Sequence, residues 1–289
     1  MDLGALFDLA PHGPDTFVGV GPRYPWGGLF GGQIVAQALR AAAGTVDPEL
    51  EPHSLRAYFI RRGDHTEPIR FEVDRIRNGR SFCTRRVVAR QAIGAILNLE
   101  ASFQRPEATT ELQPIAMPVG LPGPDDCEGD VWTTSFQRRS VPDAALAAAG
   151  ILRAGRTAVW MRVADPVVDD DLVHRCWLAY LSDDVPTDSV RRALAEHEGV
   201  TDIEAWWEGS FAASLDHTVW FHRPVKVDEW HLFDFSCHRY IGARGVSVGH
   251  VFTADGEHVA TVTQEVLVRR SRPDGRPDGR PDGTASAGE

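Results

Sequence analysis

The sequence predicts an α+β protein in which a helix wrapped by a curved antiparallel sheet occurs twice in tandem. Three observations lead to this fold class: two long helical stripes of apolar residues, a series of strand-like segments after each stripe, and a Pro/Gly-rich stretch between the halves. A chain of 289 residues, 43% of them hydrophobic, is long enough for two such units with a substantial core.

In the first half, a glycine-rich stretch, RYPWGGLFGG, begins at Arg23 and leads into the first helix. Apolar pairs then recur every four residues, which is the stripe of a helix buried on one face. These pairs are Ile34/Val35, Ala38/Leu39 and Ala42/Ala43. Strand-like segments follow at about residues 54–60, 69–76, 81–90 and 94–104, and they predict an antiparallel sheet around this helix.

The second half repeats this plan. Its stripe consists of Leu172/Val173, Cys176/Trp177 and Tyr180/Leu181. The carboxylates of Asp169 to Asp171 precede the stripe and suit the positive end of a helix dipole. Strands are expected at about residues 217–223, 230–240, 246–254 and 258–269, with Asp255-Gly256 as a hairpin turn.

The resulting domain organisation has four parts. Residues 1–105 form the N-terminal unit and residues 131–270 the C-terminal unit. Residues 106–130 carry five prolines and three glycines and are predicted to be a linker. Residues 271–289 include the tetrapeptide RPDG three times over, a composition that predicts a disordered tail.

Composition and charge exclude several classes of protein. A net charge of −11 argues against general nucleic-acid binding. No apolar stretch approaches the roughly 20 residues that span a bilayer, and the acidic N-terminus does not resemble a signal peptide. Four scattered cysteines fit a reducing compartment, so we expect a cytoplasmic protein without disulfides, metal or cofactor and with no membrane partner.

Residues 53–90 are locally basic, with ten arginines against four acidic residues. These arginines are expected either to lie on solvated strand faces or to form a landing site for a phosphorylated ligand.

Two motifs suggest chemistry that their surroundings do not support. Residues 245–249, GVSVG, match the G-x-S-x-G of serine hydrolases, but that motif requires a helix directly after the serine. Here a strand pattern follows, so Ser247 is predicted to be an ordinary strand residue. His217 and His222 are five residues apart on a predicted strand, so they point to opposite faces and cannot share a metal ion.

Four motifs in order along the chain carry a family resemblance: GGQIVAQALRAA, RSFCTRRVVARQ, LDHTVWFHRP and DGEHVATVTQE. Together they resemble the type II acyl-coenzyme A thioesterases, and the similarity runs from about residue 24 to residue 269. The resemblance implies a double hotdog fold, in which two hotdog units are fused in one chain.

The family uses an aspartate, a threonine or serine, and a glutamine to hold and activate the attacking water. By position, the resemblance assigns these catalytic roles to Asp183, Ser214 and Gln264. The physical reasoning is compatible with this assignment, because burial at the end of a helix would make Asp183 a better base. Val266 stands where glycine often follows the Gln-Glu pair of the family.

Gly31, Gly32 and Gln33 begin the first helix and are the expected substrate-binding residues. Their backbone amides would point outward without helix partners, and glycine lets a ligand approach closely. The alternative is that the glycines only allow the helix to pack against the sheet. Aromatic residues, including Trp26, Phe30, Trp206 and Trp207, are candidates for the walls of an acyl tunnel.

The predicted function is therefore hydrolysis of acyl-CoA, in particular fatty acyl-CoA, to free acid and coenzyme A, without a covalent intermediate. The resemblance also implies a homo-oligomer. Two alternatives remain: a non-catalytic acyl-CoA binding module, and a hotdog enoyl-CoA hydratase. A hydratase would need a neighbouring Asp/His pair. The helix of the second half offers only His174, far from Asp183.

Overall fold

A computed structural model describes residues 3–129, 132–200 and 203–270 of the chain. The predicted disordered tail, residues 271–289, lies outside the described residues.

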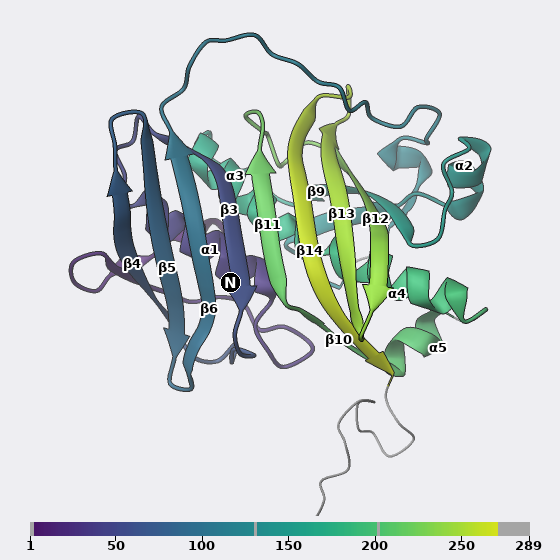
Figure 1. Ribbon diagram of the computed structural model, residues 1–289, viewed down its shortest axis with the longest axis horizontal. Coiled ribbons are helices and arrows are strands. Elements are labelled where there is room, and N and C mark those ends of the chain that lie inside the picture. The colour runs from purple at the N-terminus through teal and green to yellow at the C-terminus, as the bar shows by residue number, and fades with distance from the viewer. Residues whose placement is uncertain (1–2, 130–131, 201–202, 271–289) are drawn as a thin grey trace, which may run out of the picture.

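The N-terminal half contains one long helix and a sheet (Figure 1). Its elements are a 3₁₀ turn at Leu3–Phe7, β1 (Ala10–Pro11), β2 (Thr16–Gly19), α1 (Gly31–Ala43), β3 (Glu51–Phe59), β4 (Ile69–Asn78), β5 (Phe82–Gln91) and β6 (Gly94–Gln104). Helix α1 and the last four strands lie where the sequence pattern places them, whereas β2 was not predicted. This strand has only four residues and shows no clear alternation, so the pattern gives little signal.

The C-terminal half contains more helices than predicted. Its elements are a 3₁₀ turn at Pro124–Asp126, β7 (Glu128–Gly129), β8 (Phe136–Ser140), α2 (Asp143–Ala148), β9 (Arg156–Val163), α3 (Asp171–Leu181), α4 (Val185–His197), α5 (Ile203–Glu208), β10 (Ser210–Ser214), β11 (Asp216–Phe221), β12 (His231–Ile241), β13 (Arg244–Thr253) and β14 (His258–Arg270). Strand β9 is buried at almost every position, so it shows no alternation that would mark a strand.

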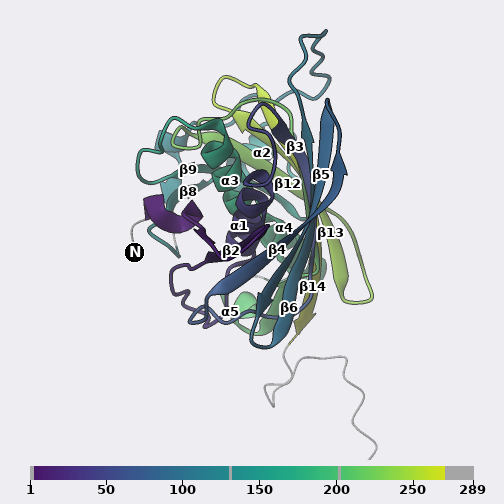
Figure 2. The ribbon, with the colours of Figure 1, turned by 90° about the vertical axis from the view of Figure 1, so that its left-hand side faces the viewer.

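The two halves share one strand order. The N-terminal half runs β2-β4-β5-β6-β3, and the C-terminal half runs β9-β12-β13-β14-β11. Strands β3 and β11 pair antiparallel, with Leu55 opposite Val219, so the two sheets form one continuous sheet. The helices lie on one face of this sheet (Figure 2), and α1 and α3 pack against each other there. No helix of the described residues is long and apolar enough to cross a bilayer.

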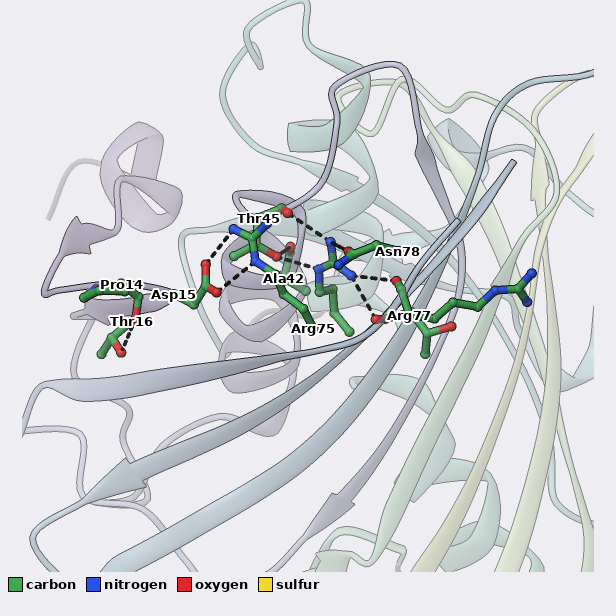
Figure 3. A network of polar contacts seen from close by, with 10 residues as sticks. Pro14, Asp15, Thr16, Ala42, Thr45, Arg75, Arg77 and Asn78 are labelled. Carbon is green, nitrogen blue, oxygen red and sulfur yellow. Dashed lines mark hydrogen bonds and ion pairs between the residues drawn. The ribbon is translucent and has the colours of Figure 1, made fainter. Parts of the chain in front are cut away.

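Several of the arginines in residues 53–90 have structural roles (Figure 3). Arg85 is 2% exposed, and its guanidinium donates to Thr45 Oγ1 (2.7 Å), the Thr45 carbonyl (3.0 Å) and Asn78 Oδ1 (2.8 Å). It therefore places a positive charge at the C-terminus of α1, where the helix dipole is negative. Arg75 forms a paired hydrogen bond with Asp15 at 2.8 Å.

Candidate active site

Asp183 lies in the short connection between α3 and α4. The apolar stripe of α3 continues to Leu181, and Pro186 stands in the first turn of α4. The two helices thus leave only a tight turn between them, and this turn carries Asp183 into the interior, where it is 6% exposed.

Ser214 and Gln264 come to Asp183 from the sheet. Ser214 is the last residue of β10, and Gln264 is the one polar residue in an inward-facing row of β14 that includes Val262 and Val266. The Ser214 hydroxyl donates to Asp183 Oδ1 (3.2 Å), and Gln264 Nε2 donates to Ser214 Oγ (2.7 Å). Gln264 is 1% exposed, so it does not face solvent as an isolated strand glutamine would. The structure thus brings these three residues together.

The N-terminus of α1, from the other half of the chain, completes the site. The Gly32 N–H donates to the Asp183 carboxylate. A Cβ on Gly31 would lie 2.5 Å from Asp183 Oδ2, so only glycine allows this approach. A Cβ on Gly32 would instead overlap the backbone carbonyl of Tyr180 in α3. The first glycine therefore makes room for the carboxylate, and the second lets the two helices pack closely.

Burial is the main influence on the Asp183 carboxyl. It raises the pKa from the ordinary 3.8 to about 7, and the negative charge of Asp184 acts in the same direction. Hydrogen bonds from Ser214, the Gly32 N–H and Gln264 favour the ionised form and oppose part of this shift. A carboxyl with a pKa near neutrality can accept a proton and release it again at physiological pH.

The neighbouring Asp184 is held in a buried ionic network. Its Oδ2 lies 3.0 Å from Arg138 Nε, and its Oδ1 accepts a hydrogen bond from Trp132 Nε1 (2.7 Å). Arg138 also pairs with Asp188 of α4. This network fixes the turn that carries Asp183, and it provides a positive counter-charge to Asp184.

Gln33 does not direct its side chain to the site. Its Oε1 accepts from the Tyr24 hydroxyl (2.8 Å), its Nε2 donates to Gln37 Oε1 (3.2 Å), and the side chain is fully buried. Gln37 in turn donates to the Leu6 and Val20 carbonyls. The Gln33 side chain therefore links α1 to the segment before it, and only its backbone belongs to the start of the helix.

Aromatic rings surround the N-terminus of α1. Phe30 contacts Trp26, Trp132 and Tyr180 with ring centroids 4.9–6.2 Å apart, and Tyr24 stacks on Trp26. Trp26 is 42% exposed, so this aromatic cluster reaches the surface. The other two aromatic candidates, Trp206 and Trp207, pack in a separate cluster with residues such as Val190 and Val266.

Reasoning from the sequence missed the contact between His217 and Gln264. His217 is fully buried, with Nδ1 2.6 Å from Gln264 Oε1 and Nε2 2.8 Å from Ser182 Oγ. The burial of His217 could have been predicted from the alternation of β11, in which His217, Val219 and Phe221 share the buried face.

The two motifs set aside earlier lie apart from this arrangement. Ser247 is a buried residue of β13, and its hydroxyl lies 2.7 Å from that of Ser189 in α4. His222 is exposed and contacts Thr261. Within the described ranges, no group of three or more His, Cys, Asp or Glu side chains is arranged to hold a metal ion.

Comparison with known proteins places these features in a family. Residues 21–104 match the family model of the acyl-CoA thioesterase N-terminal domain, and residues 109–268 match that of the C-terminal domain. The chain is 33% identical to acyl-CoA thioesterase 2 of Haemophilus influenzae over 84% of its own length and 88% of the relative's.

Solved structures agree. The acyl-CoA thioesterase II TesB2 from Mycobacterium marinum superposes with a TM-score of 0.79 at 38% identity, over 92% of this chain and 97% of that one. A protein with a hot dog fold from Alicyclobacillus acidocaldarius superposes with a TM-score of 0.73 at 22% identity, over 93% and 98% of the two chains. This chain therefore has the double hotdog fold and belongs to the type II acyl-CoA thioesterase family of thioester hydrolases.

Proposed function

We propose that the enzyme hydrolyses fatty acyl-CoA by direct attack of a water molecule that Asp183, Ser214 and Gln264 hold and activate. The observation that carries this proposal is the buried Asp183 carboxyl, whose pKa is raised to about 7 and which contacts a hydroxyl, an amide and a helix N-terminus. These are the groups that water activation requires: a base, partners that orient the water, and donors for developing negative charge.

In the proposed reaction, Asp183 accepts a proton as the water oxygen attacks the thioester carbonyl carbon. The oxygen of that carbonyl becomes negative in the tetrahedral intermediate. The start of α1 is the positive end of the helix and favours this charge; the amides of Gly31 and Gln33 can donate to it, whereas the Gly32 N–H is directed to Asp183. The intermediate then breaks its C–S bond, and the Asp183 carboxyl returns the proton to the departing thiolate. The products are a carboxylic acid and coenzyme A.

The acyl group is proposed to lie against the aromatic cluster of Tyr24, Trp26, Phe30, Trp132 and Tyr180. These rings border the two glycines and extend from the interior to the surface at Trp26. An apolar wall of this kind suits a hydrocarbon chain. A panel of acyl-CoAs of increasing chain length tests this part of the proposal, because the Trp26→Ala variant should change the dependence of KM on chain length.

The role of Asp183 is tested by coenzyme A release from Asp183→Asn, with Asp125→Asn as the matched control. The Asp125 side chain is 93% exposed, so the control makes the same chemical change on the surface. We expect Asp183→Asn to lose at least about a hundredfold in kcat and the control to keep full activity. Near-normal turnover by Asp183→Asn would remove this carboxylate from the proposed role. Absence of turnover by the wild type with all substrates, with acyl-CoA still bound, would favour a binding module.

A single turnover in ¹⁸O-labelled water tests for a covalent mechanism in which Asp183 is the nucleophile. If water attacks the thioester, the label enters the fatty acid product. If Asp183 itself attacked the thioester, water could cleave the resulting anhydride at the aspartyl carbon and leave label in the protein. Label found by mass spectrometry in the peptide that contains Asp183 would therefore contradict the proposed mechanism.

A further inference from the structure

His217 contacts Gln264 but lies behind it as seen from Asp183. Its Nδ1 is 2.6 Å from Gln264 Oε1, whereas the Nε2 of the same glutamine amide is directed to Ser214 at 2.7 Å. The other ring nitrogen lies 2.8 Å from Ser182 Oγ. The histidine thus connects the turn that carries Asp183 with the strand that carries Gln264.

The chemistry of these contacts assigns the protons. Complete burial favours the neutral ring and lowers the pKa of His217 to about 4, so only one nitrogen carries a proton. Because the carbonyl oxygen of Gln264 can only accept, Nδ1 must be the donor and Nε2 the acceptor. The single hydroxyl proton of Ser182 is directed to the Ala179 carbonyl (3.0 Å), and it can turn to Nε2, 2.8 Å away, when Nδ1 carries the ring proton.

The assigned protons then form a chain that ends at the carboxylate. His217 Nδ1–H donates to Gln264 Oε1, Gln264 Nε2 donates to Ser214 Oγ, and the Ser214 hydroxyl donates to Asp183 Oδ1. If the amide turned over, its carbonyl oxygen would face Ser214 Oγ and would compete with Asp183 for the single hydroxyl proton of the serine. A donor behind the amide is therefore needed to keep its NH₂ group forward.

We propose that His217 is a positioning residue for thioester hydrolysis, which holds the Gln264 amide with its NH₂ group toward Ser214 and Asp183. This inference rests on the function proposed above for the three residues. In this role His217 acts through Gln264, behind which it is fully buried.

Three substitutions at this position separate hydrogen bonding from packing. In His217→Asn, the amide nitrogen stands near the position of Nδ1 and can still donate to Gln264. In His217→Gln, the amide reaches the position of Nε2 and contacts Ser182 instead, and His217→Leu fills the space without any donor. We expect Asn to keep kcat within about threefold of the wild type, whereas Gln and Leu lose about tenfold or more with little change in KM.

The same comparison can overturn the proposal. Wild-type kcat in His217→Leu would show that donation to Gln264 is not needed. The same would follow if His217→Asn lost as much kcat as His217→Leu. Thermal unfolding of each variant shows which of them are folded. If His217→Leu does not fold, the comparison of kcat between His217→Asn and His217→Gln still tests the proposal.

A double-mutant cycle isolates the route through Gln264. We expect Gln264→Ala to lower kcat about a hundredfold and the addition of His217→Leu to change it by less than twofold, because the amide to be held is already gone. A further tenfold loss would show that His217 acts by another route. Gln264→Ala with full activity would contradict the proposed function itself, a different outcome from failure of the histidine proposal.

Discussion

In the proposed mechanism, the burial that raises the pKa of Asp183 favours catalysis but lowers the stability of the fold. Its folded-state pKa of about 7 lies above the ordinary 3.8, so the folded protein holds this proton more tightly than the unfolded chain does. The unfavourable contribution therefore begins as pH rises above about 4 and is complete above about pH 7. It amounts to somewhat less than about 2 kcal/mol at pH 5 and to slightly more than about 4 kcal/mol at pH 8.

The Asp183→Asn variant carries no charge at this position at any pH. We therefore expect its stability relative to the wild type to increase by about 3 kcal/mol between pH 5 and pH 8. A fixed packing effect of the new amide shifts both values equally and leaves this difference unchanged. Other titrating groups, such as His217, are present in both proteins and cancel.

The assay is equilibrium unfolding of both proteins in urea at pH 5 and pH 8, from which the free energies of unfolding in water are compared. Equal slopes with denaturant concentration are required, so that the midpoints report stability alone. A stability difference that does not change with pH would refute the assignment of a strongly raised pKa to this carboxyl. In that case Asp183 would be ionised throughout, and burial would not be the source of its basicity.

Three further predictions follow from the structure. The value of kcat/KM should rise with pH to a plateau, with a midpoint near the Asp183 pKa of about 7, because only the ionised carboxylate accepts a proton. A pH-rate profile with a midpoint near 4 would contradict this prediction. Gly31→Ala should lower kcat without large destabilisation, because the new Cβ displaces the Asp183 carboxylate. Gly32→Ala should lower the melting temperature, because its Cβ meets the Tyr180 backbone. Steady-state kinetics and thermal unfolding separate the two effects. Arg85→Met should destabilise the fold by about 2–4 kcal/mol in urea unfolding, since it leaves buried acceptors at the end of α1 without donors, and kcat of the folded variant should not change.

Local patterns were sufficient for the main elements of the fold. The four-residue recurrence of apolar pairs predicted α1 and α3, because it reflects one buried face of each helix, and strand-like segments predicted four strands after each helix. The short β2 and the fully buried β9 carry no such period and were missed. Helix α4 begins directly after Asp183 and has a mostly polar sequence, so it gave no clear stripe.

The candidate site shows a similar division. Motif resemblance named Asp183, Ser214 and Gln264, and the glycine-rich helix start made Gly31 a candidate for substrate binding, but spacing gave no reason for these residues to meet. Gln33 was expected to bind the substrate through its backbone amide, and the structure shows that its side chain bonds to Tyr24 and Gln37.

The sequence by itself determined the fold class, the repeated plan and the family, because helical and strand periods and motif order are properties of neighbouring residues. Only the tertiary structure decided that β3 and β11 join the two sheets and that α1 of one half meets the turn after α3 of the other. The proton affinity of Asp183 and the contact of His217 with Gln264 likewise come from three-dimensional packing. Both depend on removal of water and on groups that are distant along the chain, which no local pattern records.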